Sequence, residues 1–353
     1  MKTLDNIERI SALSVQVFEQ DYLLKQKPVV LTDLFASDAM NELRTIESAK
    51  IYLSSMPLEV QEEFTSSVLK TSILLDQREK KLWSFQQYLD YIEANPDTRL
   101  MATEGLTPPE IRQRFDFPDY ARINGDETFS DVASLLFLGN AGNYAHLHFD
   151  GDYRQVLLHQ VFGTKRVILI PANQAQKLSP IGNFSNVFLE NFSESDKTAF
   201  VHYANGYDFL LYPGETVFMP AGIWHYLEYC ETGMSFSVRF GRTEQLRFFG
   251  DKLHANFYLQ NIATHFIAQQ HPAIFEEIQS AYHKIYPTPV AKAQALQALF
   301  ELIYSRLCST SIQKMYAFTN FDAINESLLQ AEAQRLYPSP VSIQSLLMGW
   351  SGF

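Results

Sequence analysis

Four residues in two segments of this sequence have the types and the spacing needed to hold a metal ion. The segment NYAHLHFDGDYRQ contains His146, His148 and Asp150 at alternate positions, so on a strand all three would lie on one face. The segment PGETVFMPAGIWHYLEY places His225 just after a tight turn, about 75 residues further along. Imidazoles and a carboxylate buried together would cost desolvation free energy, and a bound metal ion would offset that cost.

We expect His148, Asp150 and His225 to be the catalytic metal ligands. Two ligands from one strand end and a third from a strand across a barrel form a facial triad, which leaves three octahedral positions open. This arrangement suits non-haem Fe(II), which must bind a bidentate co-substrate and dioxygen together. The sequence therefore predicts an iron centre.

The strands that would position these ligands are predicted between residues 134 and 240. Short apolar runs bounded by Gly, Pro or Asn recur there, namely LLFLG, RQVLLHQVFG, KRVILIP, YDFLLYPG, ETVFMP and MSFSVRF. Many short strands at this spacing predict a sandwich or jelly roll. In the last run Ser235, Ser237 and Arg239 alternate with apolar residues, so these three polar side chains share a face.

The segments before this region are predicted to be mixed α/β elements. The apolar run Lys27–Phe35 predicts a strand, and Ser37–Leu53 has helical character. A further helix is predicted over Leu82–Pro96, with Ser84 and Gln87 forming a capping box at its start.

After residue 243 the sequence becomes helical, which divides the chain into two predicted parts. Residues 1–243 would form the catalytic domain, including the N-terminal α/β elements, and residues 244–353 a C-terminal helical region. Apolar residues at helical spacing, such as Phe300 and Ile303, form a stripe that must be buried against the barrel or a partner chain.

Composition limits the classes of function. Of 353 residues, 46% are hydrophobic and 14% aromatic, which suits a large, mainly β core. The formal net charge of -12 argues against duplex nucleic acid as a partner, because phosphate binding needs clustered Lys and Arg; it mildly favours a basic peptide or protein.

Two cysteines provide no disulfide framework. No apolar stretch reaches the roughly 18 residues of a membrane span, and the N-terminus lacks a signal-peptide core, so we expect a cytoplasmic protein without a membrane partner.

Three segments, in order and at suitable spacing, resemble a known family. They are KPVVLTDLF, then HFD with VLLHQVFGTKRVILIP, and GETVFMPAGIWHYLEY with SFSVRF, together spanning about Lys27 to Gly241. They resemble the cupin-fold JmjC-type oxygenases that use Fe(II) and 2-oxoglutarate, in particular the cupin-like branch with the asparaginyl hydroxylase of hypoxia-inducible factor. The resemblance implies a double-stranded β-helix (jelly roll) and a dioxygenase. Its default reaction is hydroxylation of a protein or small molecule, and demethylation is hydroxylation at an N-methyl group.

The resemblance also implies roles for single residues. His148 and Asp150 match the H-x-D ligands of the family, and His225 matches its distal histidine. Lys165, in GTKRVILIP, matches the lysine that pairs with the far carboxylate of 2-oxoglutarate. This role is chemically sensible, because the far carboxylate needs a fixed cation and lysine supplies a compact point charge.

The chain departs from the family before its first metal ligand. Many relatives carry Thr or Ser there, whereas this chain has Tyr144 and Ala145. Tyr144 and Arg239 are therefore further candidate contacts to 2-oxoglutarate, Arg239 because it lies on the polar face of its predicted strand.

Two other classes of function stay open. His146, His148 and His225 would form a rival site typical of ordinary cupins, and the protein would then be a non-redox metal-binding cupin that binds or isomerises a small molecule such as a sugar. The third class is a non-catalytic binding module with a decayed site. Turnover of 2-oxoglutarate with Fe(II) separates the first two classes, and metal analysis decides the third.

We predict that the protein forms a homodimer through residues 244–353. In the family resembled, C-terminal helices often build such an interface, and the apolar stripe is wide enough to contact two surfaces. Light scattering should report a dimer for the intact protein and its loss in a Phe300→Glu, Ile303→Glu variant. A monomer at tens of micromolar would instead leave the alternative, a helical cap packed on its own barrel.

Overall fold

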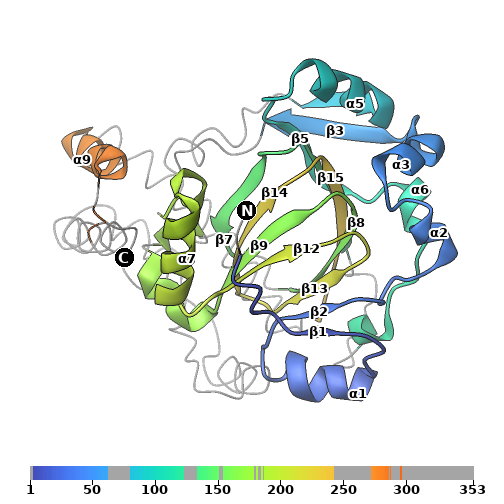
Figure 1. Cartoon of the computed structure of the whole chain (residues 1–353), viewed down its shortest axis with the longest axis horizontal. Coiled ribbons are helices and arrows are strands. Elements are labelled where there is room, and N and C mark those ends of the chain that lie inside the picture. Colours follow the sequence, from blue (N-terminus) through green and yellow to red (C-terminus); the bar gives the residue numbers. More distant parts are fainter. Residues whose placement is uncertain are drawn as a thin grey trace, which may run out of the picture.

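Two facing β-sheets form the centre of the molecule (Figure 1). The computed structural model describes residues 3–62, 80–122, 133–150, 154–178, 180–181, 184–185, 187–241 and 272–285, with residues 287 and 295.

The larger sheet has nine strands in the order β1-β2-β13-β8-β15-β6-β5-β3-β4. In chain order they are Arg9–Ile10 (β1), Val29–Leu31 (β2), Pro57–Glu62 (β3), Lys81–Ser84 (β4), Leu100–Leu106 (β5), Ala133–Gly139 (β6), Gln155–Phe162 (β8), Thr216–Met219 (β13) and Gly233–Phe240 (β15). Among these strands only β1 and β2 pair in parallel.

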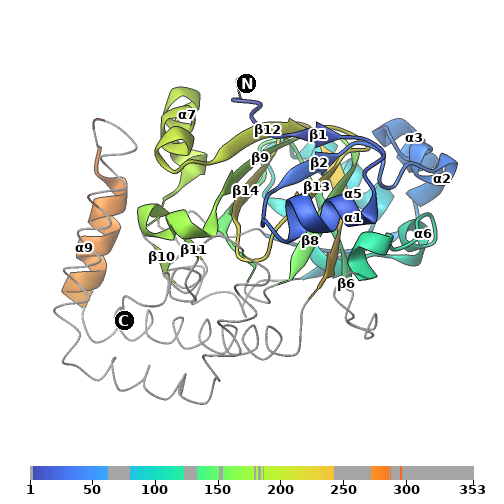
Figure 2. The same cartoon turned by 90° about the horizontal axis from the view of Figure 1, so that it is seen from below.

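The smaller sheet has six antiparallel strands in the order β10-β11-β7-β14-β9-β12. They are Tyr144–His148 (β7), Lys165–Ile170 (β9), Pro180–Ile181 (β10), Phe184–Ser185 (β11), Tyr207–Leu211 (β12) and Trp224–Tyr229 (β14). Figure 2 shows the strands of this sheet curving over those of the larger one. The predicted jelly roll with a mainly β core is confirmed.

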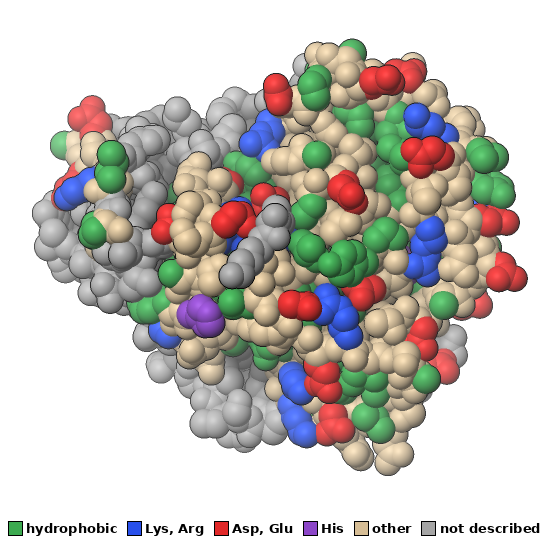
Figure 3. All heavy atoms as spheres, viewed as in Figure 1, with side chains coloured by type: hydrophobic (Ala, Val, Ile, Leu, Met, Phe, Trp, Pro, Cys, Tyr) green, Lys and Arg blue, Asp and Glu red, His purple; other side chains and the backbone are tan. Residues whose placement is uncertain are grey.

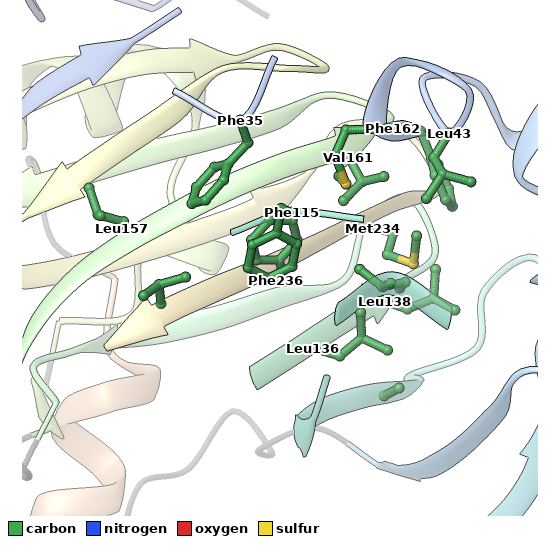
Figure 4. Close-up of a cluster of buried hydrophobic side chains, with 14 of the residues drawn as sticks. Phe35, Leu43, Phe115, Leu136, Leu138, Leu157, Val161, Phe162, Met234 and Phe236 are labelled. Atoms are coloured by element: carbon green, nitrogen blue, oxygen red, sulfur yellow. The ribbon is translucent and has the colours of Figure 1, made fainter. Parts of the chain in front are cut away.

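Helices from the first third of the chain pack on the outer face of the larger sheet. They are Val15–Phe18 (α1), Glu19–Leu23 (η1), Asp38–Asn41 (α2), Ile46–Leu53 (α3), Phe85–Ala94 (α5), Pro109–Arg112 (α6) and Asp119–Arg122 (η3). Their apolar side chains join those of β6, β8 and β15 in one cluster. At its centre the ring of Phe236 stacks on Phe115, with centroids 4.2 Å apart, and meets Phe35 edge-on at 5.2 Å (Figure 4). This helical layer therefore supports β8 and β15 on the outer face of the larger sheet.

The N-terminal predictions were right about element type and wrong about some boundaries. The capping box of Ser84 and Gln87 is present, but the helix is α5, Phe85–Ala94, rather than Leu82–Pro96. Residues 82–84 belong to β4, because pairing with β3 along Pro57–Val60 outweighs their helical preference. The helical segment Ser37–Leu53 is divided into α2 and α3, each with its own N-cap.

The outer face of the smaller sheet is covered by α7, Glu194–Tyr203 (Figure 2). A network of ion pairs joins α7 to the smaller sheet. The fully buried Arg166 donates to both oxygens of Asp208 at 2.8 Å and to Glu194 of α7 at 2.9 Å. Removing one partner from such a buried pair is strongly destabilising. Because Arg166 is anchored outward, its neighbour Lys165 points to the opposite, inner face of β9.

The C-terminal predictions fall mostly outside the described residues. Among the described residues the last strand is β15, which ends at Phe240, and Pro272–His283 forms a helix, α9. The predicted helices near residues 246–253, 296–307 and 322–336 lie outside the described part, so the domain boundary and the homodimer stay predictions. Among the described residues, no helix is both long and apolar enough to span a membrane. On the face shown in Figure 3, acidic and basic side chains are interspersed.

Candidate metal centre

The structure brings the three predicted ligands together between the sheets. His148 is the last residue of β7 and lies directly opposite His225 of β14, with ring centroids 4.3 Å apart. Asp150 follows β7, and its Oδ1 lies 3.8 Å from His148 Nε2 and 3.9 Å from His225 Nε2. One ligand atom from each residue lies within 4.8 Å of the others. With metal–ligand bonds of about 2 Å, an ion between them can reach all three after small side-chain rotations.

The two imidazoles are held in the tautomer that a metal ion needs. His148 Nδ1 donates to the carbonyl oxygen of His146 at 2.5 Å, and His225 Nδ1 donates to that of Ile223 at 3.1 Å. Each Nε2 therefore keeps its lone pair and faces Asp150. Burial and the nearby His225 lower the pKa of His148 to about 3, so its ring is neutral at physiological pH. The turn before β14 contains Gly222 at φ +75°, a conformation that favours glycine.

A β-bulge in β7 overturns the prediction that His146 shares a face with His148. Leu227 pairs with Ala145 and His225 with His148, so three steps on β7 match two on β14. The extra residue reverses the alternation. Ala145 and His148 both line the cavity between the sheets.

His146 lies on the opposite side of the smaller sheet and is buried there. Its Nε2 is 2.6 Å from the carbonyl oxygen of Ser185, its Nδ1 is 3.4 Å from Glu190, and its ring packs on Phe188 with centroids 4.6 Å apart. The rival set of His146, His148 and His225 is therefore not assembled. Tyr144 is not among the cavity residues either: it stacks on Tyr226, with centroids 6.0 Å apart. Its position gives no support to a contact with 2-oxoglutarate.

We predict that His146→Ala keeps most of its iron. The side chain contacts the backbone of Ser185 in β11, away from the cavity, whereas His148 uses only the backbone carbonyl of residue 146. Metal content per chain, measured after loading with Fe(II) without oxygen, should stay near that of the unchanged protein. A loss as complete as in His225→Ala would show that His146 belongs to the ligand set.

Lys165 lies inside the same cavity and is 1% exposed. Its Nζ donates to Ser235 Oγ at 2.5 Å and lies 4.1 Å from the ring centroid of Tyr229. Among the described residues no carboxylate lies within 4.0 Å of Nζ, and burial lowers its pKa to about 7. A buried cation without an anion is costly, so this end of the cavity suits an anionic group.

Arg239 also lies in the cavity, at the metal end. Its Nη2 is 3.4 Å from Asp150 Oδ1 and 3.8 Å from Glu104 Oε1. Between Arg239 and Ser235 on β15 lies Ser237, whose buried hydroxyl has no hydrogen-bond partner within the described part of the chain.

Sequence reasoning missed Ser235, Ser237, Glu104 and Gln61 as lining or contact residues. The alternation of SFSVRF had placed both serines on the face of Arg239, so that pattern was the available signal. Glu104 and Gln61 come from β5 and β3, for which the sequence had no comparable pattern.

Comparison with known families matches residues 14–240 to one family, described as the Cupin-like domain. The chain belongs to this family. Three relatives identify the JmjC-type branch of the Cupin-like domain family. They are lysine-specific demethylase JMJ30 of Arabidopsis thaliana (29% identical, 67% of this chain, 55% of the relative), lysine-specific demethylase 8 of Danio rerio (28%, 66%, 57%) and Jumonji C domain-containing protein 5 of Drosophila melanogaster (32%, 37%, 33%).

This Cupin-like chain spans at most about three-fifths of the length of those relatives (57%). The predicted membership of a JmjC-type oxygenase family is confirmed, and Fe(II) and 2-oxoglutarate are the cofactor and co-substrate of that family. The non-redox cupin is not favoured.

Proposed function

We propose that this protein is an Fe(II)- and 2-oxoglutarate-dependent oxygenase that hydroxylates a protein substrate. The observation that carries the proposal is the placing of His148, Asp150 and His225 in one cavity with the buried cation of Lys165. When bound, iron and 2-oxoglutarate would supply the oxidation of a substrate C–H bond by dioxygen, with succinate and carbon dioxide as co-products.

The donor set fits Fe(II). Two imidazole nitrogens and one carboxylate oxygen converge from one side of the cavity, which leaves positions for other ligands on the cavity side. The backbone carbonyls of His146 and Ile223 orient the two rings, so the centre is formed before the ion arrives.

The far end of the cavity fits the co-substrate. Lys165 pairs with Tyr229 of β14 in register, four residues from His225, or about 13 Å at about 3.3 Å per residue. The lysine side chain spans part of that distance, and a five-carbon dicarboxylate suits the remainder. Ser235 holds Nζ in place, and the buried hydroxyl of Ser237, which pairs with no group of the described residues, offers a hydrogen bond midway. Arg239 lies beside Asp150 and so would contact the metal end of 2-oxoglutarate rather than its far carboxylate.

A protein is the proposed substrate class. Two of the relatives are named lysine-specific demethylases, and the net charge of -12 favours a basic peptide. Hydroxylation of a side chain and removal of an N-methyl group use the same site, since demethylation begins with hydroxylation at the methyl carbon.

The experiment is a peptide screen monitored by succinate release. Basic peptides are incubated with the protein, Fe(II) and 2-oxoglutarate, each with unmodified or methylated lysine, and analysed by mass spectrometry. Gain of one oxygen identifies a hydroxylase and loss of a methyl group a demethylase. Absence of any succinate from a metal-loaded protein, with all peptides and with 2-oxoglutarate alone, would contradict the oxygenase and favour the non-redox cupin.

A further inference from the structure

The guanidinium of Arg239 lies between two carboxylates: that of Asp150, a proposed metal ligand, and that of Glu104, which lines the cavity but is not a ligand. Nη2 is 3.4 Å from Asp150 Oδ1 and 3.8 Å from Glu104 Oε1. The contacted oxygen of Asp150 is also the atom that faces His148 Nε2 and His225 Nε2. Arg239 thus lies next to Asp150 Oδ1, the oxygen that would coordinate a bound ion.

Glu104 is held in place by an unusual backbone. Ala102 pairs with Leu138 and Gly105 with Leu136, so β5 carries one extra residue against β6. Glu104 lies in this bulge at φ +57°, a left-handed conformation that non-glycine residues seldom adopt. Bulges next to active sites often re-aim a side chain, and such strain persists where the surrounding structure imposes it. Here the bulge brings the Glu104 carboxylate to the cavity wall.

The two carboxylates differ in burial. The Asp150 side chain is 10% exposed, whereas that of Glu104 is 63% exposed and contacts Arg239. A divalent cation on Asp150 Oδ1 would repel a guanidinium on the same oxygen, strongly so in a partly buried cavity. Arg239 is 11% exposed, so moving it into the cavity without an anion would also be costly. Glu104 removes that cost, because its oxygen is already within 4 Å of Nη2.

We propose that Glu104 is a positioning residue for the metal centre: it takes the guanidinium of Arg239 from Asp150 when the ion binds, and so raises the affinity for the ion. The inference rests on the proposed function, since it takes His148, Asp150 and His225 as the ligands. The Glu104–Arg239 pair would thus control metal binding although neither residue contacts the ion.

The test is a double-mutant cycle on metal affinity. The full-length protein is titrated with Co(II) alone, without 2-oxoglutarate, and binding is followed by visible absorption. Glu104→Gln should raise the Kd by up to about fivefold, the range expected for losing a largely exposed ion pair. Arg239→Gln should leave the Kd unchanged or lower it. In the Arg239→Gln background, Glu104→Gln should have almost no effect, because no guanidinium remains to be moved.

Two controls separate the carboxylate from the backbone and from general charge. Glu104→Gly relieves the left-handed strain but removes the carboxylate, so it should weaken Co(II) binding as Glu104→Gln does. Glu59→Gln removes an acid from the neighbouring β3, where Glu59 pairs with Lys80 at 2.6 Å, and should leave the Kd unchanged. Circular dichroism checks that each variant is folded.

Two results would overturn the inference. One is an unchanged Kd in folded Glu104→Gln. The other is an equal loss with and without Arg239, which would mean that Glu104 acts directly through its own charge. Failure of the unchanged protein to bind Co(II) would instead overturn the proposed function, so the two failures are distinguishable.

Discussion

Replacing Asp150 with alanine is expected to abolish Fe(II) binding and turnover of 2-oxoglutarate while leaving the fold intact. Asp150 supplies the one carboxylate of the cluster and lies near both imidazole nitrogens, at 3.8 and 3.9 Å. Without it, the two imidazoles would have to hold the ion alone, next to the positive charge of Arg239. Metal content, succinate release and the thermal unfolding temperature are measured on the same preparation.

The matched control is Asp90→Ala, which removes an exposed carboxylate from α5 on the outer side of the larger sheet. It should keep both the iron and the activity. Full activity in a folded Asp150→Ala protein would remove the proposed triad.

The metal cluster could be predicted because its signals are local. The H-x-D pattern fixes two ligands at one strand end, and Gly222 in the turn before β14 fixes the start of the strand that carries His225. Register across the sheet then places His225 opposite His148. Six strands, β6, β8, β9, β12, β13 and β15, had their own apolar patterns, so the jelly roll could also be predicted.

The orientation of His146 could not be predicted, because a bulge depends on pairing with another strand. The alternation of His146 and His148 is a property of a regular strand, and the extra residue in β7 becomes visible only against β14. The bulge at Glu104 has the same cause: it exists only relative to β6. The predicted start of α5 was wrong for a similar reason, because pairing with β3 extends β4 to Ser84. Local patterns thus predict elements, and pairing decides where side chains of irregular strands point.

The second large effect is expected at Lys165. Lys165→Met should raise the 2-oxoglutarate concentration needed for half-maximal turnover by roughly 10- to 150-fold. A hydrogen bond to a charged group contributes about 1.5–3 kcal/mol, and about 1.4 kcal/mol corresponds to a factor of ten. Methionine keeps most of the volume that packs on Tyr229, so the change removes the charge rather than the packing. Fe(II) binding should persist, because the cavity separates Lys165 from the ligands.

The pH dependence of co-substrate binding provides a check independent of chemistry at the iron. Burial lowers the pKa of Lys165 to about 7, so the free protein loses this positive charge as the pH rises through 7. Only the protonated amine pairs with a carboxylate; above pH 7 binding must therefore take up a proton, and the affinity for 2-oxoglutarate should fall with increasing pH.

Titration of the Mn(II)-loaded protein with 2-oxoglutarate between pH 6 and 9 should show this decline in the unchanged protein. The slope should be absent in Lys165→Met, whose affinity is low throughout because it has no proton to lose. Ser235→Ala, which removes the hydroxyl that accepts from Nζ, should keep the slope and lose less affinity, since the charge remains. An unchanged requirement for 2-oxoglutarate in Lys165→Met, or the same pH slope in both proteins, would count decisively against this lysine as the partner of the far carboxylate.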